Sequence, residues 1–284
     1  RISCNIYYEW SFGAFSSVSS PQNFNRLTFG LLSMWTWFYQ LASPKWFYTT
    51  AERLIPWFGG LALILTLVGM TLGLAFSPAD YQQGNTVRIM YIHVPAAYMS
   101  MMAYVVMAIT GGIGLIWRMK IAHMVSISCA KTGAIFTALA LVTGAIWGKP
   151  TWGTYWVWDA RLTSELILLF LYLGYLALHS AFDDKRSADK AAAVLALVGL
   201  VNIPIIHFSV EWWNTLHQGA TLSKLEKPSM DTAMLWPLLI MIAASKFYFF
   251  TTLLHQLRSV ILDREKQTRW VKNLVLDSSV KGSD

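Results

Sequence analysis

Cysteine is almost missing from this sequence, which has only Cys4 and Cys129 in 284 residues. Neither a C-x-x-C nor a C-x-x-C-H motif occurs, so the chain encodes no zinc knuckle and no site for covalent attachment of haem. The phosphate-binding loop motif G-x-x-x-x-G-K-[ST] is absent too. Any nucleotide chemistry connected with this protein must therefore belong to a partner.

Charge is also scarce, since 13% of the residues are charged and 55% are hydrophobic. Soluble domains average about 25% charged residues, and a soluble fold of this size could not bury so much apolar surface. The net charge of +7 is spread along the chain in small groups, which build no basic stripe for a nucleic acid. The composition, with 14 Trp that favour the membrane–water boundary, indicates a membrane protein.

The apolar residues gather in runs long enough to cross a bilayer as helices, which takes about 20 residues each. Six stretches qualify, at 56–76, 94–117, 125–147, 162–182, 191–210 and 232–254. The predicted fold class is therefore an all-α integral membrane protein, a bundle of six transmembrane helices. Basic residues follow the second, fourth and sixth stretches, so the positive-inside rule predicts that both termini are cytoplasmic. By parity, loops 77–93, 148–161 and 211–231 share the outer side.

The chain is expected to form one membrane domain over residues 34–272, followed by a cytoplasmic tail at 273–284. Residues 1–33 fit this pattern poorly, because they have neither a basic n-region nor a clean cleavage site for a signal peptide. The sequence that begins at Met34 resembles the start of a membrane protein. We therefore interpret 1–33 as an N-terminal extension that plays no part in membrane insertion.

The loop at 147–161 is the most unusual string in the chain. Its aromatic residues are Trp147, Trp152, Tyr155, Trp156 and Trp158. If the loop is helical, Trp152 and Trp156 are one turn apart and form a single aromatic face, which suits a large flat apolar ligand. The alternative is an aromatic belt that only anchors helix ends at the membrane surface. Asp159 precedes an apolar run and is equally suited to capping that helix or to contacting a ligand.

Two histidines border the other outer loops, His93 and His217. A single histidine at a membrane boundary is usually a hydrogen-bonding residue, but a pair beside an aromatic loop supplies the two axial nitrogens and the apolar surface that iron porphyrin needs. Arg88, Lys149 and Arg161 lie on the same side and are candidates for contacts with the haem propionates. His207 lies inside the fifth stretch, where it serves either a function or a bond to a neighbouring helix.

The string from Trp152 to Asp159, Trp-Gly-Thr-Tyr-Trp-Val-Trp-Asp, resembles the WWD signature of haem-handling proteins. Together with His93-Val-Pro-Ala-Ala and Trp-Trp-Asn-Thr-Leu-His217, it is similar to the cytochrome c maturation protein C family (CcmC, haem exporter protein C). The resemblance implies that His93 and His217 are axial ligands of a transferred haem b and that the WWD loop binds the porphyrin. It also implies a bacterial inner membrane, in preference to a mitochondrial one, and delivery of haem to the chaperone CcmE beside CcmA, CcmB and CcmD.

Two other functions remain open at this point. A b-type redox cytochrome usually holds haem between histidines inside the bundle, and only His207 lies deep in a span. A haem-translocating permease needs a polar path, whereas the spans carry little charge apart from Glu165, Lys131 and Lys246 near their ends. We therefore predict a protein that handles and transfers haem, with no catalytic residue and no nucleotide hydrolysis of its own.

Overall fold

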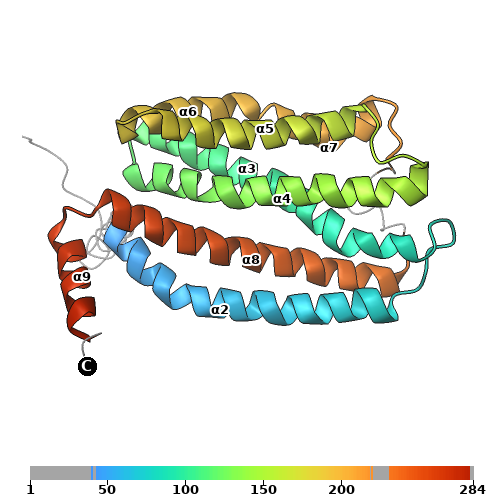
Figure 1. Cartoon of the computed structure of the whole chain (residues 1–284), viewed down its shortest axis with the longest axis horizontal. Coiled ribbons are helices and arrows are strands. Elements are labelled where there is room, and N and C mark those ends of the chain that lie inside the picture. Colours follow the sequence, from blue (N-terminus) through green and yellow to red (C-terminus); the bar gives the residue numbers. More distant parts are fainter. Residues whose placement is uncertain (1–39, 41–42, 218, 220–229, 282–284) are drawn as a thin grey trace, which may run out of the picture. The chain divides into compact units, whose positions relative to one another are not determined.

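A computed structural model describes residue 40 and residues 43–217, 219 and 230–281. The chain contacts divide it after Leu41, and of the first unit only Gln40 is described, so the predicted extension 1–33 lies outside the described residues. The helices of the second unit, drawn in Figure 1, follow in this order: α2 (Pro44–Thr71), η1 (Leu72–Phe76), η2 (Asn85–Ile89), α3 (Met90–Trp117), α4 (Lys120–Trp152), α5 (Ala160–Ala181), α6 (Lys185–Gly199), α7 (Asn202–Trp212), α8 (Thr232–Arg264) and α9 (Arg269–Lys281).

Six of these helical stretches are long and apolar enough to cross a membrane, which confirms the predicted all-α class and the six spans. The first span begins earlier than predicted, at Pro44, where the side chain of Ser43 accepts a hydrogen bond from the backbone N–H of Trp46 at 3.5 Å. Proline at the first helical position suits this start, because its missing N–H has no partner there anyway. The capped, partly polar first turns extend the helix beyond its apolar run.

The fifth span is interrupted in its middle. It consists of α6 and α7, separated at residues 200–201, and Pro204 lies in the first turn of α7. Proline has no N–H to continue the hydrogen-bond ladder, so a helix breaks or kinks just before it. The sequence predicts the span but not the break.

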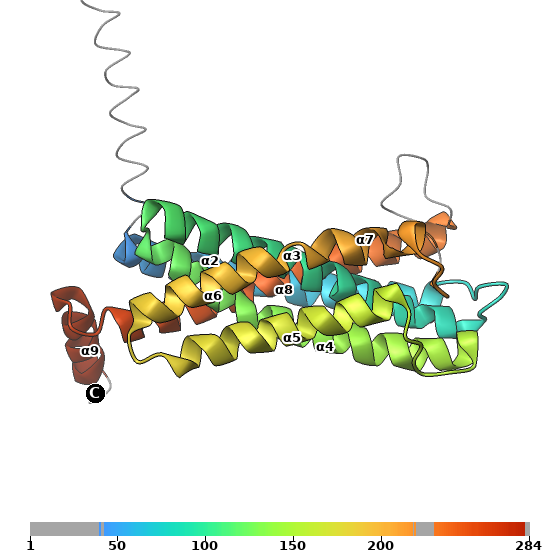
Figure 2. The ribbon, with the colours of Figure 1, turned by 90° about the horizontal axis from the view of Figure 1, so that it is seen from above.

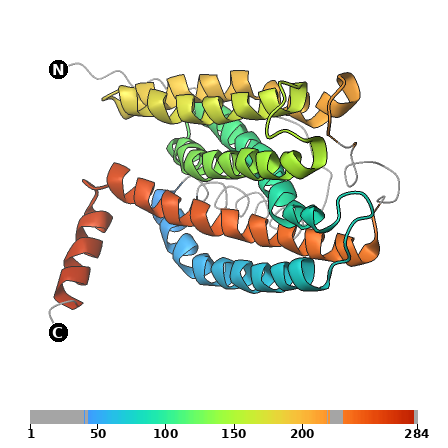
Figure 3. The same ribbon diagram turned by 45° about the vertical axis from the view of Figure 1, so that its right-hand side comes forward.

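The helices form two groups around the α3–α4 hairpin. Figure 1 shows α4 between α5 and α8, and Figures 2 and 3 show α5 and α6 packed on one side of the hairpin with the α2–α8 pair on the other. Both helices of the hairpin bury small residues, including Ala103, Ala108 and Gly111 on α3 and Ala130 on α4. Without a hydrophobic driving force between helices in lipid, small side chains let backbones approach closely enough for van der Waals packing.

Loops 77–93 and 148–161 lie at the same end of the bundle as predicted, and so does the described beginning of 211–231; that this end faces outward stays a prediction. Figure 1 shows the connections α2–α3 and α4–α5 at one end of the bundle, together with the last residues of α7. The opposite end holds the α3–α4 and α5–α6 connections and α9 (Figure 1). The boundary predicted at 272/273 falls inside α9, which packs by Trp270 on Tyr48 at 5.7 Å between ring centroids.

Candidate functional site

His93 lies in the first turn of α3 and is held by the facing helix α4. Its Nδ1 is 3.0 Å from the carbonyl oxygen of Ala140 and 3.1 Å from Oγ1 of Thr143. A carbonyl oxygen can only accept, so Nδ1 carries the proton and donates it. Nε2 is then the basic nitrogen, and it makes no hydrogen bond to any residue that the structure describes. This is the tautomer that metal-binding histidines adopt.

Gly144 provides the space for the His93 ring. A Cβ atom at position 144 would lie 2.9 Å from Cε1 of His93, closer than ordinary contact. One turn further along α4, Trp147 meets the same ring edge-on at 5.6 Å between centroids and donates from Nε1 to Oε1 of Gln83 at 2.8 Å. The imidazole is therefore fixed from two sides by α4.

His217 lies beyond the end of α7, in a non-helical segment. Its Nδ1 is 3.3 Å from Oδ2 of Asp159, while Oδ1 of the same carboxylate accepts the backbone N–H of Leu162 at 2.8 Å. Asp159 thus caps α5, one of its two predicted roles, and also orients His217. Because a carboxylate accepts the proton on Nδ1, Nε2 of this ring is the atom left for a ligand.

The environment of His217 keeps it neutral. Burial lowers its pKa from the ordinary value of 6.5, and the positive charge of Arg161 lowers it further, against the opposing effect of Asp159. Neutral imidazole is the form that binds a metal. His217 is therefore in the protonation state that a nitrogen ligand needs.

The two histidines line one cavity of about 40 Å³, together with Arg161 and Glu165. Most of the other lining residues are apolar, among them Met101, Leu162 and Ile206. This volume accommodates about one water molecule and is far too small for a porphyrin. A macrocycle could bind only at its mouth or after the two histidines separate.

Glu165 is a site residue whose position the sequence did not reveal. It is buried in the first turns of α5, accepts a hydrogen bond from Oγ of Ser100 at 2.8 Å, and lies one turn beyond Arg161 on the same face. The four-residue spacing between Arg161 and Glu165 was the available signal. Without the helix packing, nothing indicated that this face meets the histidines.

The aromatic loop does not form the continuous helical face that Trp152 and Trp156 would make. α4 ends at Trp152, because Gly153 adopts a left-handed conformation with φ +79°, and residues 153–159 are not helical. Trp152 instead meets His217 at 4.7 Å between ring centroids, and Trp156 meets Trp158 at 5.3 Å. The tryptophans therefore form separate pairs, one of which includes a candidate ligand.

The three cationic candidates occupy different positions. Arg161 lines the cavity of the two histidines. Lys149 donates to the carbonyl oxygen of Gly153 at 3.0 Å and lies over the Tyr155 ring at 5.2 Å, so it stabilises the loop itself. Arg88 donates from Nη2 to the carbonyl oxygen of Ser77 at 3.1 Å. Only Arg161 is brought beside both histidines.

Comparison with known proteins identifies the relatives of this arrangement. Residues 37–272 match the family model described as Heme exporter protein C. A protein of that name from Haemophilus influenzae is 53% identical over 241 residues, which covers 85% of this chain and 98% of the relative. This chain belongs to the haem exporter protein C family. The resemblance seen in the sequence is thereby confirmed.

Other members of the family extend the comparison. The Heme exporter protein C of Escherichia coli K12 is 51% identical over 243 residues, covering 86% of this chain and 98% of the relative. A putative cytochrome c biosynthesis ccmC-like mitochondrial protein of Marchantia polymorpha is 44% identical over 211 residues, covering 74% and 89%. The matched region contains both histidines and the aromatic loop, so the family assignment rests on the segment that carries the site.

Proposed function

We propose that this member of the haem exporter protein C family binds haem between His93 and His217 and delivers it to the chaperone CcmE for the maturation of c-type cytochromes. One observation carries the proposal: both imidazoles have Nδ1 engaged by an acceptor, and both line the same cavity. Two such nitrogens are what haem iron needs for six-coordination. The cargo is haem b, bound reversibly and passed on.

The surroundings of the histidines fit a porphyrin in charge and shape. Arg161 can neutralise a propionate by a charge-assisted hydrogen bond. Exposed aromatic rings lie near His217 and its partner Asp159 in the chain: Trp158, which is 75% exposed, precedes Asp159, and Trp212 and Trp213, which are 55% and 49% exposed, lie five and four residues before His217. Such rings supply a flat apolar surface for the macrocycle. This favours the platform reading of the loop over a plain aromatic belt.

The partners and the compartment follow from the family expectation and from what the chain lacks. We propose that CcmA and CcmB supply the ATP-driven step and that CcmD assists the complex, because this sequence has no phosphate-binding loop of its own. The site lies at the bundle end that the distribution of basic residues predicts to face outward, and we propose that the membrane is a bacterial inner membrane, as the family resemblance implies. The chain itself then binds and transfers haem without catalysing a reaction.

The test is the haem content of purified His93→Ala and His217→Ala variants. Each loses one axial nitrogen, so we expect a lower haem content and a change from a low-spin six-coordinate to a high-spin five-coordinate absorption spectrum. His123→Ala is the matched control, because His123 lies beside Gly114 at the other end of the bundle. Wild-type content and spectra in both outer variants would refute the ligand assignment.

A second experiment separates transfer from electron transport. Haem-loaded protein in detergent is mixed with apo-CcmE, and the haem associated with each protein is measured after separation. A transfer protein loses haem to the chaperone, whereas a b-type cytochrome keeps its haem and cycles between oxidation states. Uptake of haem into sealed vesicles containing this chain alone would instead favour a permease.

A further inference from the structure

A second and larger cavity lies at the end of the bundle opposite the histidines. Its volume is about 230 Å³, and it is lined by the last turns of α5 and α8, the first residue of α6 and the first turns of α4. α4, α5 and α8, and α6 taken together with α7, are long enough to span a membrane, and their spans begin or end here. The cavity is therefore at the level of a lipid headgroup, and none of its lining residues belongs to the haem site.

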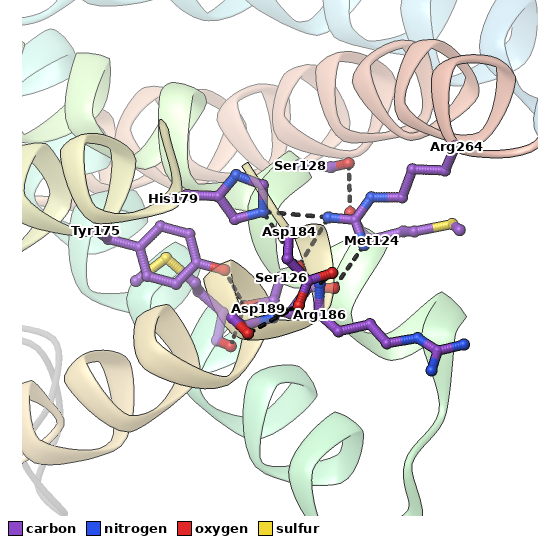
Figure 4. Close-up of polar contacts among 11 residues, drawn as sticks. Met124, Ser126, Ser128, Tyr175, His179, Asp184, Arg186, Asp189 and Arg264 are labelled. Atoms are coloured by element: carbon purple, nitrogen blue, oxygen red, sulfur yellow. Dashed lines mark hydrogen bonds and ion pairs between the residues drawn. The ribbon is translucent and has the colours of Figure 1, made fainter. Parts of the chain in front are cut away.

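One wall of this cavity is an ionic cluster whose charges are balanced (Figure 4). Arg264 donates from Nη1 and Nη2 to the two carboxylate oxygens of Asp189, at 2.6 and 2.7 Å. Nε2 of His179 lies 3.1 Å from both partners. A bidentate pair of this kind fixes α8 to α6 and uses the charge of Arg264. The cluster shapes the cavity without giving it a net charge.

One lysine of the cavity wall has no ion-pair partner among the residues that the structure describes. Asp263 pairs with Lys266 at 3.7 Å, whereas Lys185 lines the cavity and makes no ion pair within the described ranges 43–217 and 230–281. Lys131 lies one turn beyond the cavity residue Ile127 on α4, is exposed, and likewise has no ion-pair partner among the residues described. A long lysine side chain in a span extends toward the headgroup level. One or two positive charges are thus available there.

An apolar row leads from the cavity along α4. It starts at Ile127, passes Lys131 and continues through Ile135 and Leu139, one turn apart, to Val142 and Ile146. The last four side chains are 62%, 38%, 58% and 53% exposed. In a spanning helix, exposed apolar side chains such as these are available to the acyl chains of lipids. A cavity with a lysine that is unpaired within the described part of the chain, and with exposed apolar side chains further along α4, matches an amphiphile with an anionic head.

We propose that this cavity binds the phosphodiester headgroup of a membrane phospholipid, with an acyl chain lying along the Ile135 to Ile146 row of α4. A phosphodiester carries one negative charge, which Lys185 can match. Basic pockets between spanning helices are known sites for lipid headgroups. Haem fits less well, because the nearby imidazole of His179 already has its Nε2 between Asp189 and Arg264.

The test is native mass spectrometry of the full chain released from detergent after extraction from bacterial membranes. We expect wild-type protein to retain one phospholipid. Lys185→Gln should retain it with about tenfold lower affinity, since one charge-assisted contact is lost. Lys190→Gln is the matched control, because Lys190 is an exposed lysine on the same helix and does not line the cavity. No retained phospholipid in the wild type, or equal retention in both variants, would overturn the proposal.

Added competitors identify the ligand chemistry. Dioleoylphosphatidylglycerol should replace the retained lipid, and millimolar inorganic phosphate should not, because phosphate has no acyl chain for the α4 row. Displacement by inorganic phosphate or by haem would overturn the phospholipid assignment. Ser259→Phe fills the cavity with an apolar ring and should abolish retention, while an unchanged haem spectrum at the other end reports an intact fold.

Discussion

Replacing Gly144 by alanine tests whether α4 determines the position of the His93 ring. The added methyl group would lie 2.9 Å from Cε1 of His93 and 3.4 Å from Nδ1, so the ring must move by roughly half an ångström to restore ordinary contact. That movement weakens the hydrogen bond from Nδ1 to Ala140, which fixes the tautomer. Loss of such a supporting contact typically costs 10- to 100-fold in metal affinity, or about 1.4 to 2.7 kcal/mol.

The measurement is the dissociation constant for haem of the purified variant, determined by absorption titration, with the low-spin band as a report of two axial ligands. Gly60→Ala is the matched control, because a Cβ at position 60 on α2 meets nothing within 4 Å. Alanine is the better helix former by roughly 1 kcal/mol, so neither protein should lose helix stability from propensity. Wild-type affinity and spectrum in Gly144→Ala would refute the argument that α4 positions His93.

Three further predictions concern the opposite ligand. Asp159→Asn keeps the cap on α5 but removes the charge beside His217, so the stability in thermal unfolding should hold while the affinity for haem falls. Asp159→Ala also removes the cap and should in addition lose about 1 kcal/mol of stability in thermal unfolding. Because the pKa of His217 lies below 6.5, its imidazole should stay a neutral ligand as pH falls past 6.5. Arg161→Gln removes the positive charge that lowers this pKa, so the release of haem by acid should move to higher pH in a spectroscopic titration. Trp152→Ala removes the ring that contacts His217 and should lower the amount of haem loaded onto the chaperone at normal expression, whereas Trp152→Phe should keep most of that loading. Equal loading by both variants would support the alternative in which the loop is only an aromatic belt.

The six spans could be predicted because the bilayer imposes a simple rule: an uncharged run of sufficient length forms a helix. The rule fails where helices extend beyond the apolar run. The capping of α2 by Ser43 and the polar last turns of α8 depend on local hydrogen bonds, which hydropathy does not register. The break between α6 and α7 was indicated only by Pro204, and proline is tolerated in many spanning helices.

The site could be predicted as a set of residue types but not as a geometry. Counting the spans between the two loops predicted that His93 and His217 lie at the same end of the bundle, and this prediction depends only on the number of spans. The contacts that prepare them come from α4 and from Asp159, and these depend on helix packing. The loop is not helical as the shared face of Trp152 and Trp156 required, because α4 ends at Trp152 and the next residue, Gly153, is left-handed.

The two proposed ligands differ in how they are held, and this difference determines which of them dissociates more easily when haem is transferred. His93 lies in a helix and is hydrogen-bonded by a second helix, so moving it requires the α3–α4 packing to change. His217 lies in a non-helical segment, and Asp159 and Trp152 hold it by side-chain contacts alone. Since the cavity is far too small for a porphyrin, placing one between the two imidazoles requires one of them to move, and moving His217 breaks fewer contacts. We therefore expect His217 to be the ligand that dissociates when haem leaves. If chaperone and haem-loaded protein are mixed and frozen during transfer, the trapped species should have haem bound by His93 and no longer by His217.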